Sequence, residues 1–157
     1  MAQLIKKCKK DKDYMAEDII WKIFSQLLQA LNVCHCKKAG NSIGTIIHRD
    51  IKPGNVFFDG CNNVKLGDFG LSRLLSQESL YAQTNVGTPY YMSPEQINEA
   101  NYNEKTDIWS LGCVLYEMVA LKPPFTASNH IALANKILRG DFDRIPDRYS
   151  EDLQRAI

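Results

Sequence analysis

The sequence predicts a mainly α-helical domain with small β-hairpins. Apolar residues recur on one helical face over residues 20–31, and they lie almost all round a helix over residues 106–121. Between these stretches, two short extended runs flank the turn-forming residues 59–63, which predicts a hairpin. A chain of 157 residues is long enough for one domain with its own core.

Composition and charge exclude several classes of protein. The chain is 45% hydrophobic and 24% charged, as in an ordinary globular protein. Its 19 Lys and Arg against 18 Asp and Glu give a formal charge of +1, so no overall field favours nucleic acid or an anionic membrane as a partner. The apolar stretch 1–5 is too short for a secretory signal, and Glu117 interrupts the apolar run 113–116. We therefore expect a soluble, intracellular protein without a membrane segment.

The cysteines point to a reducing compartment. There are five, an odd number, and they are scattered along the chain rather than arranged as a disulfide framework. Cys34-His35-Cys36 has the residue types of a metal site, but zinc sites normally use two ligand pairs. No second pair with such spacing follows, so we expect no metal on these residues.

The first half of the chain predicts one long helix and three short strands. Glu17 and Asp18 supply negative charge where a helix dipole favours it. Residues 34–44 read as an exposed loop with glycines and a basic pair. Strands are expected at 45–47, 56–58 and 64–66, the last two as the hairpin. The apolar face of the long helix is formed by Ile20, Ile23, Phe24, Leu27, Leu28 and Leu31.

The second half predicts a long loop and then helices. Residues 70–93 show no sustained period, and a loop of this length is usually functional or disordered. Ser93-Pro94-Glu95-Gln96 combines a hydroxyl cap, a proline at the first helical position and a glutamine three residues after the cap, which predicts a helix start. The helix over 106–121 should lie at the centre of the domain and end before Pro123-Pro124.

Two further helices are expected near the C-terminus. Gly140 closes the first of them, and residues 151–157 begin the second. The apolar stripe of the first is formed by Ile131, Ala134, Ile137 and Leu138.

Three motifs follow one another in a fixed order. His48-Arg49-Asp50-Ile51-Lys52-Pro53-Gly54-Asn55 and Asp68-Phe69-Gly70 each come after a predicted strand, and Gly87-Thr88-Pro89-Tyr90-Tyr91-Met92-Ser93-Pro94-Glu95 closes the long loop. In this order and spacing they resemble the large-lobe signature of eukaryotic protein kinases, with Ile51 and Ser93 in place of Leu and Ala. The resemblance runs from end to end. It implies that residues 1–157 are a partial protein kinase domain, the truncated C-terminal (large) lobe of that fold.

The resemblance implies phosphoryl transfer from ATP with magnesium. Asp50 would accept or orient the proton of the substrate hydroxyl. Lys52 would reach the transferred phosphate, as in serine/threonine kinases, and the hydroxyl of Thr88 would connect Lys52 to Asp50. Asn55 and Asp68 would face one another across the cleft and bind Mg²⁺ through the oxygen ligands that this hard cation prefers.

Arg49 beside Asp50 implies control by phosphorylation of the long loop. Kinases with this pair are commonly regulated in that way, because a phosphate adds about 1.5 to 2 negative charges that such an arginine can bind. The candidate positions are Thr84 first, then Ser79 and Thr88. Loop hydroxyls are also often merely solvated, so both interpretations stay open for Thr84.

Other matching residues imply structural roles. His48 and Phe69 resemble the stacked core residues of the family, with Gly70 completing the motif. Asp107 matches the aspartate that accepts hydrogen bonds from the backbone around residues 48–49. Glu95 matches a glutamate that ordinarily pairs with an arginine of a later helix.

The longer segments around these motifs resemble NIMA-related serine/threonine kinases, and especially their centrosomal mitotic member. They are residues 63–71, 86–96, 102–113, 123–127 and 144–150. This resemblance implies protein substrates with serine or threonine acceptors and a role in the cell cycle, in centrosome separation or microtubule organisation. It also implies a cytoplasmic, centrosomal or nuclear location. Leu71 would favour serine over threonine.

Several parts of the family pattern are missing from these 157 residues. They hold no glycine-rich phosphate loop, no Val-Ala-Ile-Lys strand lysine and no partner glutamate on a small-lobe helix. The last large-lobe helices and the coiled-coil dimerisation tail are also missing. Two hypotheses follow: part of a serine/threonine kinase that is active when joined to its small lobe, or a catalytically inactive product that acts at most as a binding or scaffold module.

Overall fold

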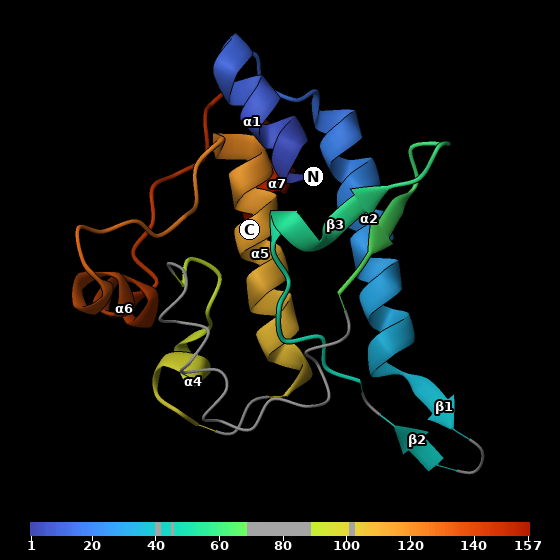
Figure 1. Cartoon of the computed structure of the whole chain (residues 1–157). Coiled ribbons are helices and arrows are strands. Elements are labelled where there is room, and N and C mark those ends of the chain that lie inside the picture. The colour runs from blue at the N-terminus through green and yellow to red at the C-terminus, as the bar shows by residue number, and fades with distance from the viewer. Residues whose placement is uncertain (40–41, 45, 69–88, 101–102) are drawn as a thin grey trace.

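The computed structural model describes residues 1–39, 42–44, 46–68, 89–100 and 103–157 (Figure 1). Two long helices dominate, α2 (Glu17–His35) and α5 (Glu104–Ala120), and they pack against each other. The shorter helices and the hairpins surround this pair, so the expected mainly α fold with small hairpins is confirmed. None of the described helices is both long and apolar enough to span a membrane.

α2 buries the expected face. Ile20, Ile23, Leu27 and Leu31 are at most 3% exposed, whereas Leu28 on the flank is 39% exposed. The helix packs both on α5 and on strand β4 (Val64–Leu66), so it connects the helical core to the hairpin. The backbone N–H of Val64 donates to the side-chain Oε1 of Gln26 at 2.6 Å and fixes this contact.

The chain begins with a helix that the periodicity did not predict. α1 (Ala2–Asp11) buries Ile5 and packs Leu4 and Cys8 against the core. It lies at the end of the fold where α2 begins and α5 ends (Figure 1). Three apolar residues among lysines make a weak sequence signal, and the packing against the core stabilises the helix.

The prediction of a strand at residues 45–47 is wrong. Ile46 and Ile47 lie in no strand, and the segment expected as a loop contains strands β1 (Lys37–Ala39) and β2 (Ser42–Gly44) instead. These pair antiparallel in the register Lys37↔Gly44 and Ala39↔Ser42. β-branched residues favour extended backbone, but a strand also needs a neighbouring strand for its hydrogen bonds.

The second hairpin agrees with the prediction. β3 (Val56–Phe58), which follows the short 3₁₀ helix η1 (Pro53–Asn55), pairs antiparallel with β4 in the register Val56↔Leu66. In the turn, Oδ1 of Asp59 accepts hydrogen bonds from the backbone N–H groups of Asn63 at 2.8 Å and Cys61 at 2.9 Å. Hydrogen bonds from Asn63 lower the pKa of Asp59.

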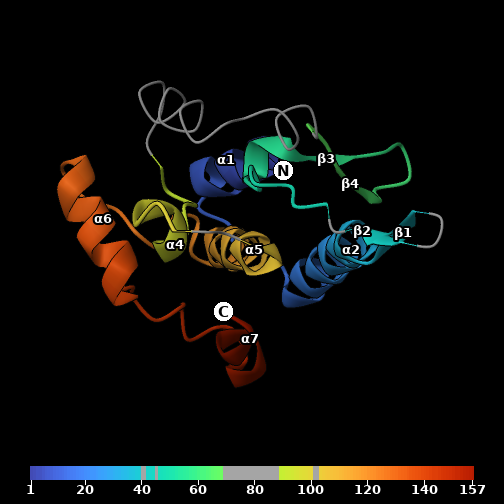
Figure 2. The same cartoon turned by 90° about the horizontal axis from the view of Figure 1, so that it is seen from below.

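α5 is the central helix, as its composition predicts. Four of its apolar side chains are 0% exposed: Val114, Leu115, Met118 and Val119. α4 (Pro94–Ile97) and α6 (His130–Arg139) lie on one side of α5, and α2 with the β1–β2 hairpin lies on the other (Figure 2). α5 therefore contacts both halves of the described fold.

The remaining helices form where the sequence predicts them. Ser93 and Gln96 make the capping box of α4, and Gly140 closes α6 in the left-handed conformation with φ 64°. α7 (Glu151–Ala156) is capped by Ser150. The stripe expected on α6 is partly wrong, because Ile131 is 78% and Leu138 42% exposed while Leu133 and Ile137 form the buried face.

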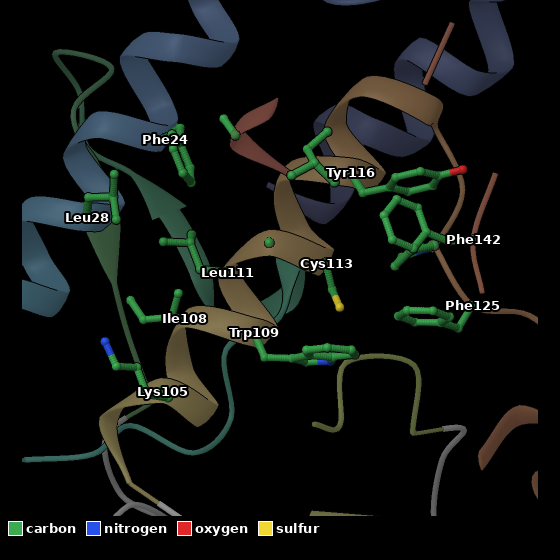
Figure 3. Close-up of a pocket in the computed structure, with 14 residues that line it drawn as sticks. Phe24, Leu28, Lys105, Ile108, Trp109, Leu111, Cys113, Tyr116, Phe125 and Phe142 are labelled. Carbon is green, nitrogen blue, oxygen red and sulfur yellow. The ribbon is translucent and has the colours of Figure 1, made fainter. Parts of the chain in front are cut away.

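An apolar hollow of about 350 Å³ opens beside α5 (Figure 3). Trp109 and Phe125 stack on one wall with ring centroids 5.7 Å apart. Among the described residues, Lys105 is the one charged side chain of the lining. The hollow is therefore distinct in chemistry from a site that would handle phosphate and Mg²⁺. The other large side chains that line it are Phe24, Leu28, Ile108, Leu111, Tyr116 and Phe142.

α5 also fixes the segment that precedes α4. The hydroxyl of Tyr91 donates to Oε2 of Glu117 at 2.5 Å, and the hydroxyl of Ser110 donates to the backbone carbonyl of Tyr91 at 2.8 Å. Burial raises the pKa of Glu117 and of Tyr91. This segment is thus held by polar contacts to the central helix.

We expect Tyr91→Phe to lower the free energy of unfolding by about 1–3 kcal/mol, because it removes the donor of a partly buried carboxylate. Urea unfolding at pH 7 measures the change. Tyr14→Phe is the matched control, since no hydrogen bond of the Tyr14 hydroxyl occurs in the described part of the chain, and it should change stability by less than about 0.5 kcal/mol. Equal effects of the two variants would contradict the role of the Tyr91 contact.

Glu117 should make stability depend on pH. Burial raises its pKa above 4.5, so the folded chain keeps a proton on Glu117 at pH values where the unfolded chain has released it. The stability of the native chain should fall, relative to that of Glu117→Gln, as pH rises from 4.5 through the raised pKa. Parallel urea titrations from pH 4 to 8 test this, and a constant difference between the two proteins would disprove it.

Candidate active site

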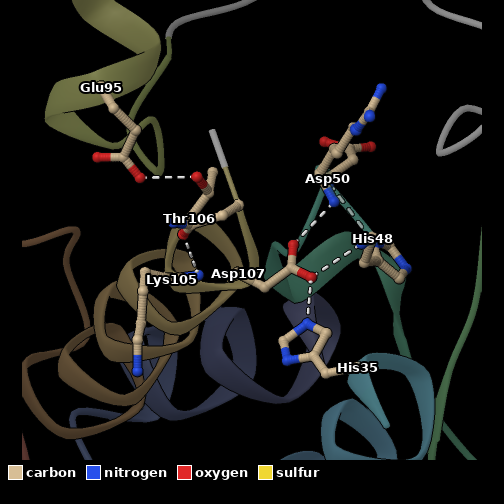
Figure 4. A network of polar contacts seen from close by, with 9 residues as sticks. His35, His48, Asp50, Glu95, Lys105, Thr106 and Asp107 are labelled. Atoms are coloured by element: carbon tan, nitrogen blue, oxygen red, sulfur yellow. Dashed lines mark hydrogen bonds and ion pairs between the residues drawn. The ribbon is translucent and has the colours of Figure 1, made fainter. Parts of the chain in front are cut away.

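The site is assembled around the carboxylate of Asp107, in the first turn of α5 (Figure 4). Its Oδ2 accepts from the backbone N–H of His48 at 2.8 Å, and its Oδ1 accepts from the backbone N–H of Arg49 at 2.8 Å. Asp107 is 1% exposed. A buried charge is costly unless it is hydrogen-bonded, and here the bonds fix the backbone next to Asp50. The structure thus shows the contact that the sequence implies for Asp107.

A third partner of Asp107 comes from α2. Nε2 of His35 lies 2.8 Å from Oδ2 of Asp107, and the His35 side chain is 11% exposed. The contact joins residues that are 72 positions apart in the chain. The sequence pattern gave no sign of this contact, because His35 stands out only as part of Cys34-His35-Cys36. Among the described residues no group of three His, Cys, Asp or Glu could hold a metal ion.

Arg49 adopts the left-handed backbone conformation, with φ 71°. This region is unfavourable for a residue with a side chain, and such positions persist where surrounding contacts determine them. The hydrogen bond from the Arg49 N–H to Asp107 provides one such contact.

His48 is a packed residue with 0% exposure. Its Nε2 lies 2.9 Å from the carbonyl oxygen of Gly67, and its Nδ1 accepts from the backbone N–H of Asp50 at 3.3 Å. A carbonyl only accepts and an N–H only donates, so these partners select the tautomer with hydrogen on Nε2. His48 therefore connects the Asp50 backbone to the residue that follows β4.

Asp50, Lys52 and Asn55 come together. Nζ of Lys52 lies 2.7 and 2.9 Å from the two carboxylate oxygens of Asp50. Nδ2 of Asn55 donates to Oδ2 of Asp50 at 2.8 Å and to its backbone carbonyl at 2.8 Å. The Asp50 side chain remains 22% exposed and that of Lys52 42% exposed. The Asp50 carboxylate is thus oriented by two side chains and is still accessible.

Asp68 lies one residue beyond a backbone contact with this cluster. The N–H of Gly67 donates to the carbonyl of Asn55 at 2.9 Å, and Asp68 follows in the left-handed conformation with φ 64°. Gly67 has no room for a side chain, because an added Cβ would lie 2.8 Å from the ring of Phe57. Asp68 itself is exposed. The fold therefore brings Asp68 to the same end of the hairpin as Asn55.

The donor set fits a hard divalent cation. The amide nitrogen of Asn55 is engaged by Asp50, while its Oδ1 has no hydrogen-bond partner among the described residues. The other candidate ligand, Asp68, offers an exposed carboxylate. An amide oxygen and a carboxylate are ligands that Mg²⁺ prefers.

Within the described residues, Glu95 is held by a threonine of α5, and the helix that would carry the arginine partner of the family was expected to be missing from these 157 residues. Glu95 accepts a hydrogen bond from the Thr106 hydroxyl at 2.7 Å, which connects α4 to the start of α5. Partial burial acts in the opposite direction, but the bonds from Thr106 and from the backbone hold the pKa of Glu95 below its usual value. The remaining predicted positions, Phe69, Gly70, Ser79, Thr84 and Thr88, lie outside the described residues.

Comparison with known proteins agrees with this geometry. The protein kinase domain family matches residues 1–155. A probable serine/threonine-protein kinase nek2 of Dictyostelium discoideum is 54% identical over 157 residues, which is 100% of this chain and 36% of the relative. The serine/threonine-protein kinase Nek2 of Homo sapiens is 54% identical over the whole chain and 35% of its own length. The G2-specific protein kinase nimA of Emericella nidulans is 41% identical over 177 residues, 25% of its length.

The chain therefore spans about a third of the length of the first two relatives. The family match covers nearly every residue, and it includes the segment in which Asp50, Lys52 and Asn55 converge. The chain belongs to the protein kinase family, and within it to the NIMA-related serine/threonine kinases.

Proposed function

We propose that this chain carries the phosphoryl-transfer centre of a protein kinase that uses ATP and Mg²⁺ to phosphorylate serine or threonine side chains of proteins. The observation that carries the proposal is the Asp50 carboxylate, held by Lys52 and Asn55 at 2.7–2.9 Å and still accessible. A carboxylate oriented in this way can accept the proton of an incoming hydroxyl. Membership of the kinase family supports the same role.

Lys52 and Asn55 would act on both sides of Asp50. Lys52 places a positive charge beside the carboxylate, where it can also attract a phosphoryl group that carries negative charge. The amide nitrogen of Asn55 donates to Asp50, and its amide oxygen could then bind a cation. We propose Asn55 and Asp68 as the Mg²⁺ ligands, and bound Mg²⁺ would neutralise charge on the ATP phosphates.

The proposal assigns the remaining candidates supporting roles. Asp107, His48 and Glu95 would position the site through the hydrogen bonds described above. Phosphorylation of Thr84, or of Ser79 or Thr88, would regulate it through Arg49. Phe69 and Gly70 would complete the magnesium motif. Residues 1–157 would form the large-lobe part of the kinase domain.

We also propose a cell-cycle role for the whole protein. The relative in Emericella nidulans is named a G2-specific protein kinase, and it is 41% identical over 177 aligned residues. The resemblance in the motif regions supports serine/threonine substrates and a centrosomal or nuclear location. These finer assignments rest on the family rather than on a contact within the site.

A chimera tests the catalytic assignment. This chain would replace the matching 157-residue segment of the human relative, whose other segments supply the rest of a kinase. We expect the chimera to phosphorylate a protein substrate and Asp50→Asn to lower kcat by about 10²–10⁴-fold, because the carboxylate acts on the reacting proton. Asp141→Asn, a change of an exposed aspartate on another surface, is the control and should keep full activity. A folded chimera with no activity would favour the inactive binding or scaffold module.

The magnesium assignment has its own readout. In the same chimera, Asp68→Asn should raise the Mg²⁺ concentration for half-maximal activity by at least about tenfold, because a neutral amide replaces a charged ligand. Asp59→Asn, at the turn of the same hairpin, should leave that concentration unchanged. An unchanged magnesium requirement in Asp68→Asn would show that the cation is held by other groups.

On its own, the 157-residue chain should transfer no phosphate. Its sequence contains no glycine-rich loop and no Val-Ala-Ile-Lys lysine to hold the nucleotide phosphates. Incubation with labelled ATP, Mg²⁺ and a protein substrate measures this directly. Turnover that disappears in Asp50→Asn would mean that the described residues suffice for catalysis.

A further inference from the structure

The first helix carries a concentrated positive charge. Residues 6–13 contain five lysines and two aspartates, a net charge of +3, whereas the whole chain has +1. Lys6, Lys7, Lys9 and Lys10 of α1 are all exposed. We call these four residues the lysine face.

The lysine face points away from the core. Ile5 is 5% exposed, and Leu4 and Cys8 pack against the core cluster. At 100° per residue, the four lysines span an arc of about 160° on the opposite side of the helix. The exposed half of α1 is therefore almost wholly basic.

No lysine of the lysine face forms an ion pair within the described part of the chain. The lysines that form ion pairs there are Lys52, Lys65 and Lys122. Lys9 acts at longer range on Glu117, where it opposes the effect of burial on the pKa. Lysines three and four residues apart on one helix repel each other and destabilise it. An external anion would relieve this repulsion.

The surroundings favour an acidic protein segment as that anion. The apolar side of α1 is buried, so no face remains to insert into a lipid bilayer. The helix is about 15 Å long; exposed Asp11 is its last residue, and the exposed acids Asp13 and Asp18 follow it. A nucleic-acid duplex that continued past the helix would therefore meet repulsive charge. Lysines bind as point charges and lack the rigid fork with which arginine grips a single phosphate. We propose that the lysine face docks a short run of Asp and Glu residues of a partner protein.

This docking surface does not depend on the proposed catalytic function. None of its residues belongs to the Asp50 cluster, and binding can be measured without phosphoryl transfer. A negative result in one experiment therefore leaves the other unaffected.

The test uses the 157-residue chain and a fluorescent octaglutamate peptide at low ionic strength. Lys6→Gln/Lys7→Gln/Lys10→Gln should weaken binding roughly five- to fiftyfold, because three charge contacts are lost. Lys22→Gln/Lys105→Gln/Lys136→Gln is the matched control, since it removes the same charge from exposed positions on α2, α5 and α6. It should change binding by less than about twofold. Binding should also weaken when salt rises from 50 to 200 mM, because the Debye length shortens and the exposed charges are screened more strongly.

Three outcomes would overturn the proposal. One is no binding of octaglutamate to the native chain at low salt, with circular dichroism showing it folded. The second is an equal weakening of octaglutamate binding in the two triple variants, which would show that only the net charge of the chain matters and not the position of the lysines. The third is tighter binding of a 20-base-pair duplex or of phosphatidylserine vesicles than of octaglutamate, with the same loss in the α1 variant, which would assign the face to nucleic acid or to a membrane.

Discussion

The buried carboxylate of Asp107 is the interaction on which the site depends. A charge at 1% exposure costs several kcal/mol unless donors surround it, and Asp107 receives the N–H groups of His48 and Arg49 and a contact from His35. Because the donors come from α2 and from the segment before β3, their positions relative to α5 are fixed together. The left-handed turn at Arg49 and the orientation of Asp50 follow from this arrangement.

α5 can play this part because it is buried along most of its length. Its first turn holds the backbone of His48 and Arg49 through Asp107, and its later turns hold the Tyr91 segment through Ser110 and Glu117. Two segments that are far apart in sequence are therefore both hydrogen-bonded to the same helix. The capping box and Glu95 attach α4 to the same helix start, through the Thr106 hydroxyl.

The chain handles charge in two contrasting ways. At the site, two carboxylates are oriented by partners: Asp107 by backbone donors, and Asp50 by Lys52 and Asn55. On α1, like charges are gathered on the exposed side of a helix whose other side is buried. The first arrangement suits a reaction that needs fixed geometry, and the second suits attraction of a flexible acidic segment.

Local patterns were enough to predict α2, α5, α7, the β3–β4 hairpin and the capped start of α4, because each signal lies within a few residues. The motif order also predicted that Asp50, Lys52 and Asn55 act together, and the structure places their side chains in contact. Helix α1, the β1–β2 pairing and the buried face of α6 could be seen only in the folded chain, since each depends on what packs against it. The tertiary structure also decided that His35 reaches Asp107, a contact across 72 positions that no local pattern encodes.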